Sequence, residues 1–114
     1  VGLEQLIRGS GVNDLEVVDA FDIKTIKSTV KKALDADHLS VIIVRGDCAV
    51  RIKARSGPRA VETEKCNDCG MCLLLGCSAI QKDGDKVRID ATLCAGDICT
   101  ICEQVCPRGA IELK

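Results

Sequence analysis

The chain has 114 residues, nine of them cysteine, and carries a formal net charge of −1. This charge supplies no general cationic field for nucleic acid, and the longest apolar run, residues 39–44, is much shorter than the ~18 residues of a membrane span. Phe21 is the single aromatic residue. The apolar core is therefore small, and something besides hydrophobic burial is expected to stabilise the fold.

The start of the chain lacks the basic and then apolar pattern of a secretory signal. We therefore expect a cytoplasmic protein, with no nucleic-acid partner and no membrane. Because the first residue is Val1 rather than Met, we also expect a piece of a longer protein. A change in composition near residues 57 and 58 divides it into two segments.

The first segment, residues 1–57, predicts alternating helix and strand. Apolar residues at helical spacing predict a first helix that ends at the glycines of residues 9–11, and residues 15–18 predict a short strand. Asp22 is placed to cap a second helix, whose apolar positions follow a period of about 3.6. Residues 39–44 form a β-branched run without alternation, which is typical of a strand buried on both faces of a parallel sheet.

The end of this segment alternates, so that Cys48, Val50 and Ile52 predict one more strand with a solvated face. Basic residues alternate with them and form either a solvated surface or a docking site for an acidic partner or coenzyme A phosphates: Arg51, Lys53 and Arg55. We expect Cys48 to be a small buried hydrophobic residue and His38 to be simply exposed. These elements are too few to bury a parallel sheet, so the segment is predicted to be an incomplete α/β unit.

The second segment, residues 58–114, contains an internal repeat. Residues 61–66 are echoed 28 residues later by residues 89–94, and residues 77–80 are echoed by residues 106–111. Each copy holds four cysteines. They are Cys66, Cys69, Cys72 and Cys77 in the first copy, and Cys94, Cys99, Cys102 and Cys106 in the second.

The spacing of these cysteines indicates the chemistry of the site. Three cysteines separated by two residues each let a short loop wrap around one iron–sulfur cluster, and a distant fourth cysteine completes the ligands. Gly70 and Gly96 let the backbone approach such a cluster, where N–H groups can bond to sulfur. Metal ligation would supply folding free energy that the small core lacks.

Two other uses of the cysteines compete with a cluster. Disulfides could pair them, but overlapping runs suit a shared metal centre better, and no secretory signal indicates an oxidising compartment. Structural zinc takes two separate cysteine pairs, whereas three cysteines at successive short spacings oversupply one tetrahedral ion. The gap from Cys94 to Cys99 is two residues longer than usual, and Cys77 is followed by Ser78 rather than Pro. If Cys94 does not reach, that cluster becomes a three-iron species.

Through these motifs residues 59–114 resemble the two-cluster ferredoxin family. The resemblance implies an α+β class, with a bacterial-type two-[4Fe-4S] ferredoxin fold of pseudo-two-fold symmetry. In that family the fourth cysteine of each run binds the cluster of the other repeat. The implied ligands are Cys66, Cys69, Cys72 and Cys106 for one cluster, and Cys77, Cys94, Cys99 and Cys102 for the other.

The order of the two segments resembles a second family. The α/β segment ends in residues 39–48 and is followed directly by a unit whose first motif has four residues before its last cysteine. This order resembles the C-terminal part of the alpha subunit of indolepyruvate ferredoxin oxidoreductase. The resemblance implies that residues 1–57 end a thiamine diphosphate-type domain and that residues 58–114 form the ferredoxin domain.

This family oxidatively decarboxylates aryl 2-oxoacids with coenzyme A and passes electrons to an external ferredoxin. The resemblance implies an electron relay with no catalytic residue in these 114 residues. Thiamine diphosphate and Mg are expected only in the upstream part of the full enzyme. A second subunit of beta or gamma type is the implied partner.

Two further readings remain open. One is a free-standing two-cluster ferredoxin with a small α/β domain that binds a partner. The other is a zinc-stabilised nucleic-acid module, suggested by the basic residues between positions 45 and 59. The lack of nearby aromatic side chains for base stacking argues against this module.

Overall fold

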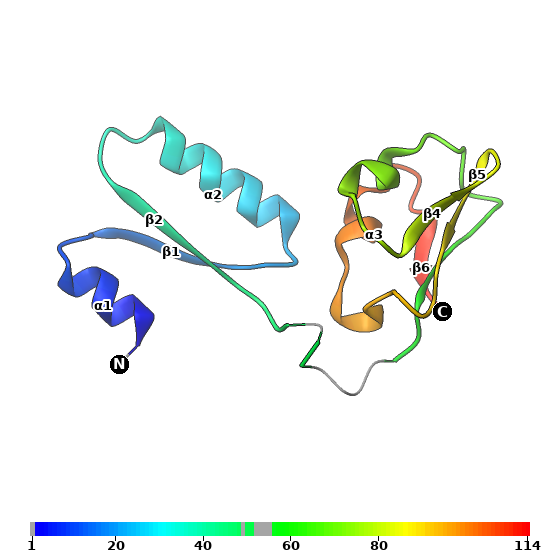
Figure 1. Cartoon of the computed structure of the whole chain (residues 1–114). Helices are drawn as coiled ribbons and strands as arrows, with labels where there is room; N and C mark the ends of the chain where they lie inside the picture. Colours follow the sequence, from blue (N-terminus) through cyan, green and yellow to red (C-terminus); the bar gives the residue numbers. More distant parts are fainter. Residues whose placement is uncertain (1, 49, 52–55) are drawn as a thin grey trace. The chain divides into compact units, whose positions relative to one another are not determined.

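The structure is a computed structural model of the whole chain that describes residues 2–48, 50–51 and 56–114 (Figure 1). The chain forms two compact units, Val1–Gly46 and Asp47–Lys114. Each unit has its own small sheets and its own buried residues, and each is described by itself below.

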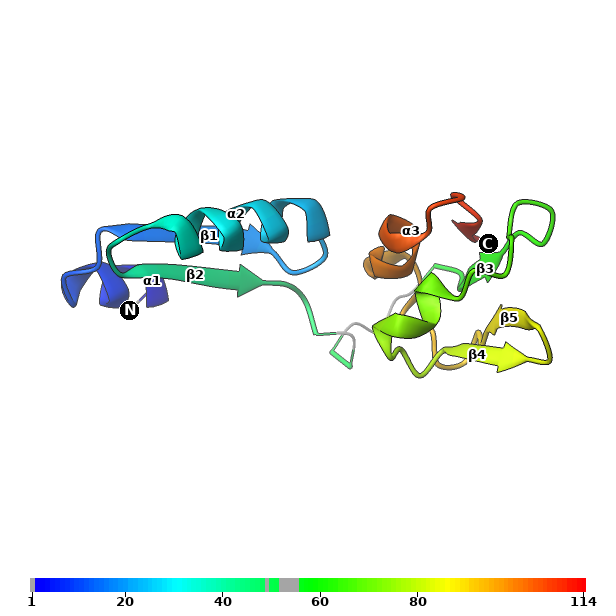
Figure 2. The same cartoon turned by 90° about the horizontal axis from the view of Figure 1, so that it is seen from above.

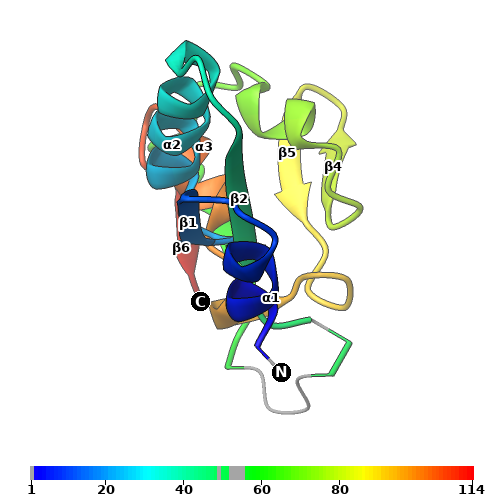
Figure 3. The same cartoon turned by 90° about the vertical axis from the view of Figure 1, so that its left-hand side faces the viewer.

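The first unit is built around a pair of parallel strands. Its elements are α1 (Leu3–Gly9), β1 (Asp14–Asp19), α2 (Ile23–Asp35) and β2 (Ser40–Arg45). β1 and β2 pair in register from Asp14 opposite Ser40 to Asp19 opposite Arg45. α2 connects the two strands and packs along both, as Figure 2 and Figure 3 show.

The sequence predicted most of this unit. Both helices and both strands are confirmed, and Asp22 caps α2 by accepting a hydrogen bond from the Thr25 backbone N–H at 3.1 Å. The parallel pairing is confirmed, but the expected burial of β2 on both faces is wrong. The first four residues of β2 are half-buried and the last two are exposed, because α2 covers only one face of the described strand pair.

The strand expected around Cys48 is also wrong for the residues that the structure describes. Cys48 and Arg51 instead close a turn, in which the Arg51 N–H donates to the Cys48 carbonyl at 2.9 Å. A short alternating pattern does not make a strand unless another strand pairs with it. Cys48 is exposed rather than a buried hydrophobic residue. Ile52, Lys53 and Arg55 lie outside the described residues.

The described residues of the second unit form two antiparallel strand pairs and three short helical segments. β3 (Arg59–Val61) pairs with β6 (Ile111–Leu113), and β4 (Ile80–Asp83) forms a hairpin with β5 (Lys86–Ile89). The helical segments are the 3-10 helices η1 (Met71–Leu75) and η2 (Gly96–Ile98), and α3 (Ile101–Val105). The turn predicted at residues 83–85 is the turn of the β4–β5 hairpin.

The sequence repeat is also a repeat of backbone hydrogen bonds. The Cys66 N–H donates to the Glu62 carbonyl at 3.0 Å, and 28 residues later the Cys94 N–H donates to the Asp90 carbonyl at 3.0 Å. The Glu62 N–H donates to the Ala110 carbonyl at 2.6 Å, and the Asp90 N–H to the Ala79 carbonyl at 2.7 Å. Each copy therefore anchors its cysteine loop to the alanine that follows the last cysteine of the other copy.

The core of the second unit is small and follows the same repeat. Ala79 and Ala110 are each 1% exposed, and the isoleucines that follow them, Ile80 and Ile111, are also buried. Such a core agrees with the expectation that burial alone provides little stability. Within the described parts of the chain, no helix has both the length and the apolar character that crossing a membrane requires.

Candidate metal centre

Four cysteines from two distant stretches of the second unit line one pocket. Cys66, Cys69, Cys72 and Cys106 line a pocket with a cavity volume of about 20 Å³. Apolar residues make up much of the remaining wall, among them Val61, Met71, Val87, Ala110 and Ile111. The structure therefore brings together the four residues that the sequence assigned to one cluster.

The loop that carries the first three cysteines turns through left-handed backbone conformations. Asp68 has a φ of 56° and Gly70 a φ of 74°, and Gly70 is the residue that immediately precedes η1. The Asp68 N–H donates to Cys66 Sγ at 3.4 Å, and the Ala110 N–H donates to Cys106 Sγ at 3.3 Å. N–H groups aimed at sulfur stabilise the negative charge of a thiolate ligand.

The thiols of this pocket interact with one another. Burial raises the pKa of Cys72, and the neighbouring Cys106 and Cys66 raise it further. A free thiolate is therefore disfavoured there. A bound metal group would reverse the preference for the protonated thiol, because a coordinating cysteine loses its proton.

The metal-ligating side chains of this pocket are four thiols. Among the described residues, no group of three or more His, Cys, Asp or Glu side chains lies close enough to hold a metal ion. Cysteine thiolates are the usual ligands of iron–sulfur clusters. Four thiols around a largely apolar pocket fit such a group.

A second group of cysteines gathers at the other repeat. Burial raises the pKa of Cys102 to about 11, and the nearby Cys99 and, less strongly, Cys94 contribute to the increase. These three thiols therefore share one neighbourhood. Cys77 is exposed and follows η1, and its assignment to this group remains a prediction from the sequence.

Cys94, the cysteine at the start of the unusually long gap, accepts hydrogen bonds from the backbone. Its Sγ accepts the backbone N–H of Gly96 and that of Arg59, each at 3.4 Å. The first bond matches the Asp68 bond of the other repeat, whereas the second comes from β3. Although the gap has two additional residues, the Cys94 sulfur therefore accepts the same kind of backbone hydrogen bond as the Cys66 sulfur.

The long gap is tied to the segment that precedes β3. The Ser56 N–H and Oγ donate to the Asp97 carboxylate at 3.2 and 2.5 Å, and the Asp97 N–H donates to the Ser56 carbonyl at 3.3 Å. These bonds hold the pKa of Asp97 below its usual value. The sequence did not predict the contacts of Ser56, Arg59 and Asp97 around this gap, since no local pattern links residues so far apart.

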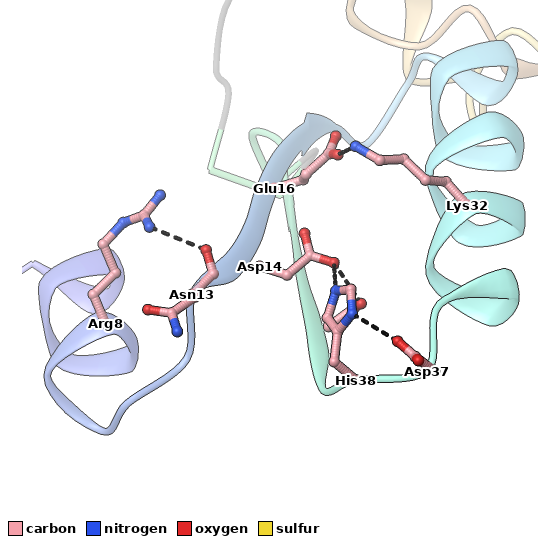
Figure 4. A network of polar contacts seen from close by, with 8 residues as sticks. Arg8, Asn13, Asp14, Glu16, Lys32, Asp37 and His38 are labelled. Carbon is pink, nitrogen blue, oxygen red and sulfur yellow. Dashed lines mark hydrogen bonds and ion pairs between the residues drawn. The ribbon is translucent and has the colours of Figure 1, made fainter.

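The first unit has a surface network of charged groups (Figure 4). His38 Nε2 lies 2.9 Å from Asp14 Oδ2, which also accepts a hydrogen bond from Ser40 Oγ at 2.6 Å. The bond from Ser40 and then that from His38 lower the pKa of Asp14, while the bonds to Asp14 and then Asp37 raise the pKa of His38. His38 is exposed as expected, but it also joins the loop that follows α2 to β1.

The fold and the site together define a small α+β protein whose second unit is a cysteine-rich, twice-repeated module. Neither a protein-family model nor a solved structure matches the chain. Curated proteins do match. It is 34% identical over 98% of its length to the indolepyruvate oxidoreductase subunit IorA of Archaeoglobus fulgidus, and 38% identical over 98% to that of Methanothermobacter thermautotrophicus.

The subunit IorA of Pyrococcus horikoshii is 38% identical over 96% of the chain. The chain spans only 19%, 18% and 18% of the lengths of these three relatives. Over the matched stretch, the chain is similar to a part of the indolepyruvate oxidoreductase subunit IorA. The match covers both compact units, so the first unit is not an unrelated addition to a cysteine-rich module.

Proposed function

We propose that this chain relays electrons through two [4Fe-4S] clusters within a thiamine-dependent 2-oxoacid ferredoxin oxidoreductase of the indolepyruvate or arylpyruvate type. The observation that carries the proposal is the pocket in which Cys66, Cys69, Cys72 and Cys106 meet from both repeats. Exchange of the last cysteine between repeats is the pattern of bacterial two-cluster ferredoxins. The names of the matched relatives support the oxidoreductase context.

The residues of the first cluster would be the four of this pocket. Those of the second would be Cys94, Cys99 and Cys102 together with Cys77. A bound [4Fe-4S] cluster supplies reversible one-electron transfer. The chain holds the sulfurs with backbone N–H donors, as at Cys66 and Cys106, and limits water with the apolar wall of the pocket.

An ion pair also connects the loop of the proposed first cluster to a neighbouring strand. Lys86, on β5, bonds Asp68 Oδ2 at 3.1 Å, and the Asp68 N–H donates to Cys66 Sγ. The hairpin of β4 and β5 is thereby joined to the cysteine loop. Fixing the loop limits the reorganisation around a cluster when its charge changes by one electron.

In this proposal the first segment, residues 1–57, is the end of a thiamine diphosphate-type α/β domain. Large apolar side chains on the first unit support this, since Leu34 is 79% and Leu39 69% exposed. The full enzyme would use thiamine diphosphate, Mg, coenzyme A and a 2-oxoacid to form an acyl-CoA. Its partners would be a beta- or gamma-type subunit and an external ferredoxin as electron acceptor.

The test is metal analysis of anaerobically purified protein. Two cubane clusters require about eight iron and about eight sulfide per chain. Cys69→Ala should lose one cluster, whereas Cys48→Ala, which removes an exposed cysteine outside both predicted sites, should keep both. Zinc in place of iron, or equal losses in the two variants, would reject the proposal.

A further inference from the structure

Arg59, the first residue of β3, is a buried charged residue outside the predicted ligand set. Its side chain is only 7% exposed. Burying a guanidinium is costly unless it is paired and hydrogen-bonded. Pairing of β3 with β6 uses only backbone groups at this position, so the strand itself does not require the buried charge.

Arg59 reaches three points around the second cysteine group. Its backbone N–H donates to Cys94 Sγ at 3.4 Å, and its Nε donates to the Cys99 carbonyl at 2.9 Å. Its Nη1 bonds the carboxylate of Glu103 in α3. A single residue therefore holds both ends of the long cysteine gap and the helix that follows it.

The same guanidinium places a permanent positive charge beside this group. The basic residues near the first pocket differ from Arg59 because they are exposed to solvent. The side chain of Lys86 is 65% exposed, and Arg108 is also exposed. Water screens exposed charges far more than buried ones.

We propose that Arg59 is a positioning residue for the second cluster and that its charge raises the reduction potential of that cluster. The inference rests on the proposed function, since it requires clusters at these cysteines. Reduction adds negative charge to a cluster, and a nearby buried cation stabilises that form. Arginine keeps its charge at any accessible pH, and its planar fork presents donors to two acceptors in a fixed geometry that the lysine ammonium does not reproduce.

The experiment compares Arg59→Gln, Arg59→Lys and Arg88→Gln in the anaerobically purified chain. Arg88 is an exposed arginine on β5 and serves as the control for charge removal. Iron content is measured first, and then each cluster is titrated with dithionite under EPR. Cys72→Ala and Cys102→Ala variants assign the signals to the first and second cluster.

In Arg59→Gln the midpoint potential of the second cluster should fall by about 59 mV. For a one-electron couple, this lowers the ratio of reduced to oxidised cluster roughly tenfold at the midpoint potential of the unmodified protein. The first cluster should not change, and Arg88→Gln should leave both clusters unchanged. Loss of iron from the second site alone would also support the positioning role. Equal behaviour of Arg59→Gln and Arg88→Gln would overturn it.

If Arg59→Gln loses both clusters, the Arg59→Lys variant tests the inference instead. Lysine keeps the positive charge, so retention of the second cluster at nearly its original potential, or a change confined to that cluster, supports the inference, while equal changes in both clusters overturn it. Failure of the proposed function gives a different result, because the unmodified chain would then contain no iron at either site.

Discussion

Ser56 and Asp97, 41 residues apart, bond each other in both directions, with two bonds to the Asp97 carboxylate and one from its backbone N–H to the Ser56 carbonyl. Ser56 lies just before β3, and Asp97 lies in η2, inside the long gap from Cys94 to Cys99. The corresponding gap of the first run, from Cys66 to Cys69, has only two residues. The bonds therefore fix the one segment in which the two repeats differ most.

Breaking this clamp should loosen the second cluster. We expect Asp97→Asn and Ser56→Ala each to release iron from the second site a few times faster than the unmodified protein, because the long gap loses its charge-assisted bonds. Release of iron to a chelator under anaerobic conditions measures this. Asp85→Asn, in the exposed hairpin turn, is the control. Equal release from Asp97→Asn and Asp85→Asn would show that the clamp does not hold the cluster loop.

Gly96, beside the clamp, should not tolerate a side chain. It has a φ of +73°, and an added Cβ would lie 2.6 Å from the Gly57 carbonyl oxygen. Gly76 offers a matched control, with a φ of +68° and no atom within 4 Å of an added Cβ. Gly76→Ala should cost about 1 kcal/mol for its backbone conformation alone.

Gly96→Ala should cost roughly 3 kcal/mol, because the clash adds to the same conformational penalty. Anaerobic denaturant unfolding of the cluster-loaded chain measures both values. Similar losses of stability in the two variants would mean that the segment around Gly57 moves aside at little cost.

The sequence predicted the features that depend on local pattern. The cap at Asp22 and the repeat of the cysteine loops were both readable, because a cap is set by adjacent residues and a repeat by matching spacings. The eight candidate ligands follow from the same spacing. The structure gathers four of them in one pocket and three in a second group, while the place of Cys77 remains a prediction.

Features that depend on contacts between distant segments could not be read in this way. The bonds of Arg59 to Cys99 and Glu103 span 40 and 44 residues. The burial of β2 depends on which elements cover it, and composition does not report this. Cys48 shows the same limit, since a free cysteine is usually buried but this one lies exposed in a turn.

Cys94 should prove to be a ligand in spite of its long gap. Its Sγ accepts two backbone N–H groups, as a sulfur ligand of a cluster commonly does. Cys94→Ala should lower iron from about eight to about seven per chain or remove the second cluster, with the first unaffected. EPR of the oxidised protein detects a three-iron cluster, and Cys48→Ala is the control. Full retention of two four-iron clusters in Cys94→Ala would show that this cysteine does not bind iron.

The pair formed by Asp14 and His38 should depend on pH in a defined direction. The pKa of His38 is raised above its ordinary 6.5, chiefly by the bond to Asp14 and then by that to Asp37. Its contribution to stability is therefore complete below the unfolded-state pKa and is lost as the pH rises through the higher folded-state pKa. The pKa of Asp14 is lowered from 3.8, so its contribution is present above that value and is lost as the pH falls through the lower folded-state pKa.

His38 is the only histidine of the chain, so its ring protons give an unambiguous NMR titration. We expect Asp14→Asn to bring the pKa of His38 most of the way back to its ordinary value, because it removes the charge that faces Nε2. Asp37→Asn should have a smaller effect, because Asp37 lies farther away, 3.5 Å from Nδ1, and is fully exposed. A larger shift in Asp37→Asn than in Asp14→Asn would show that the bond to β1 does not govern this histidine.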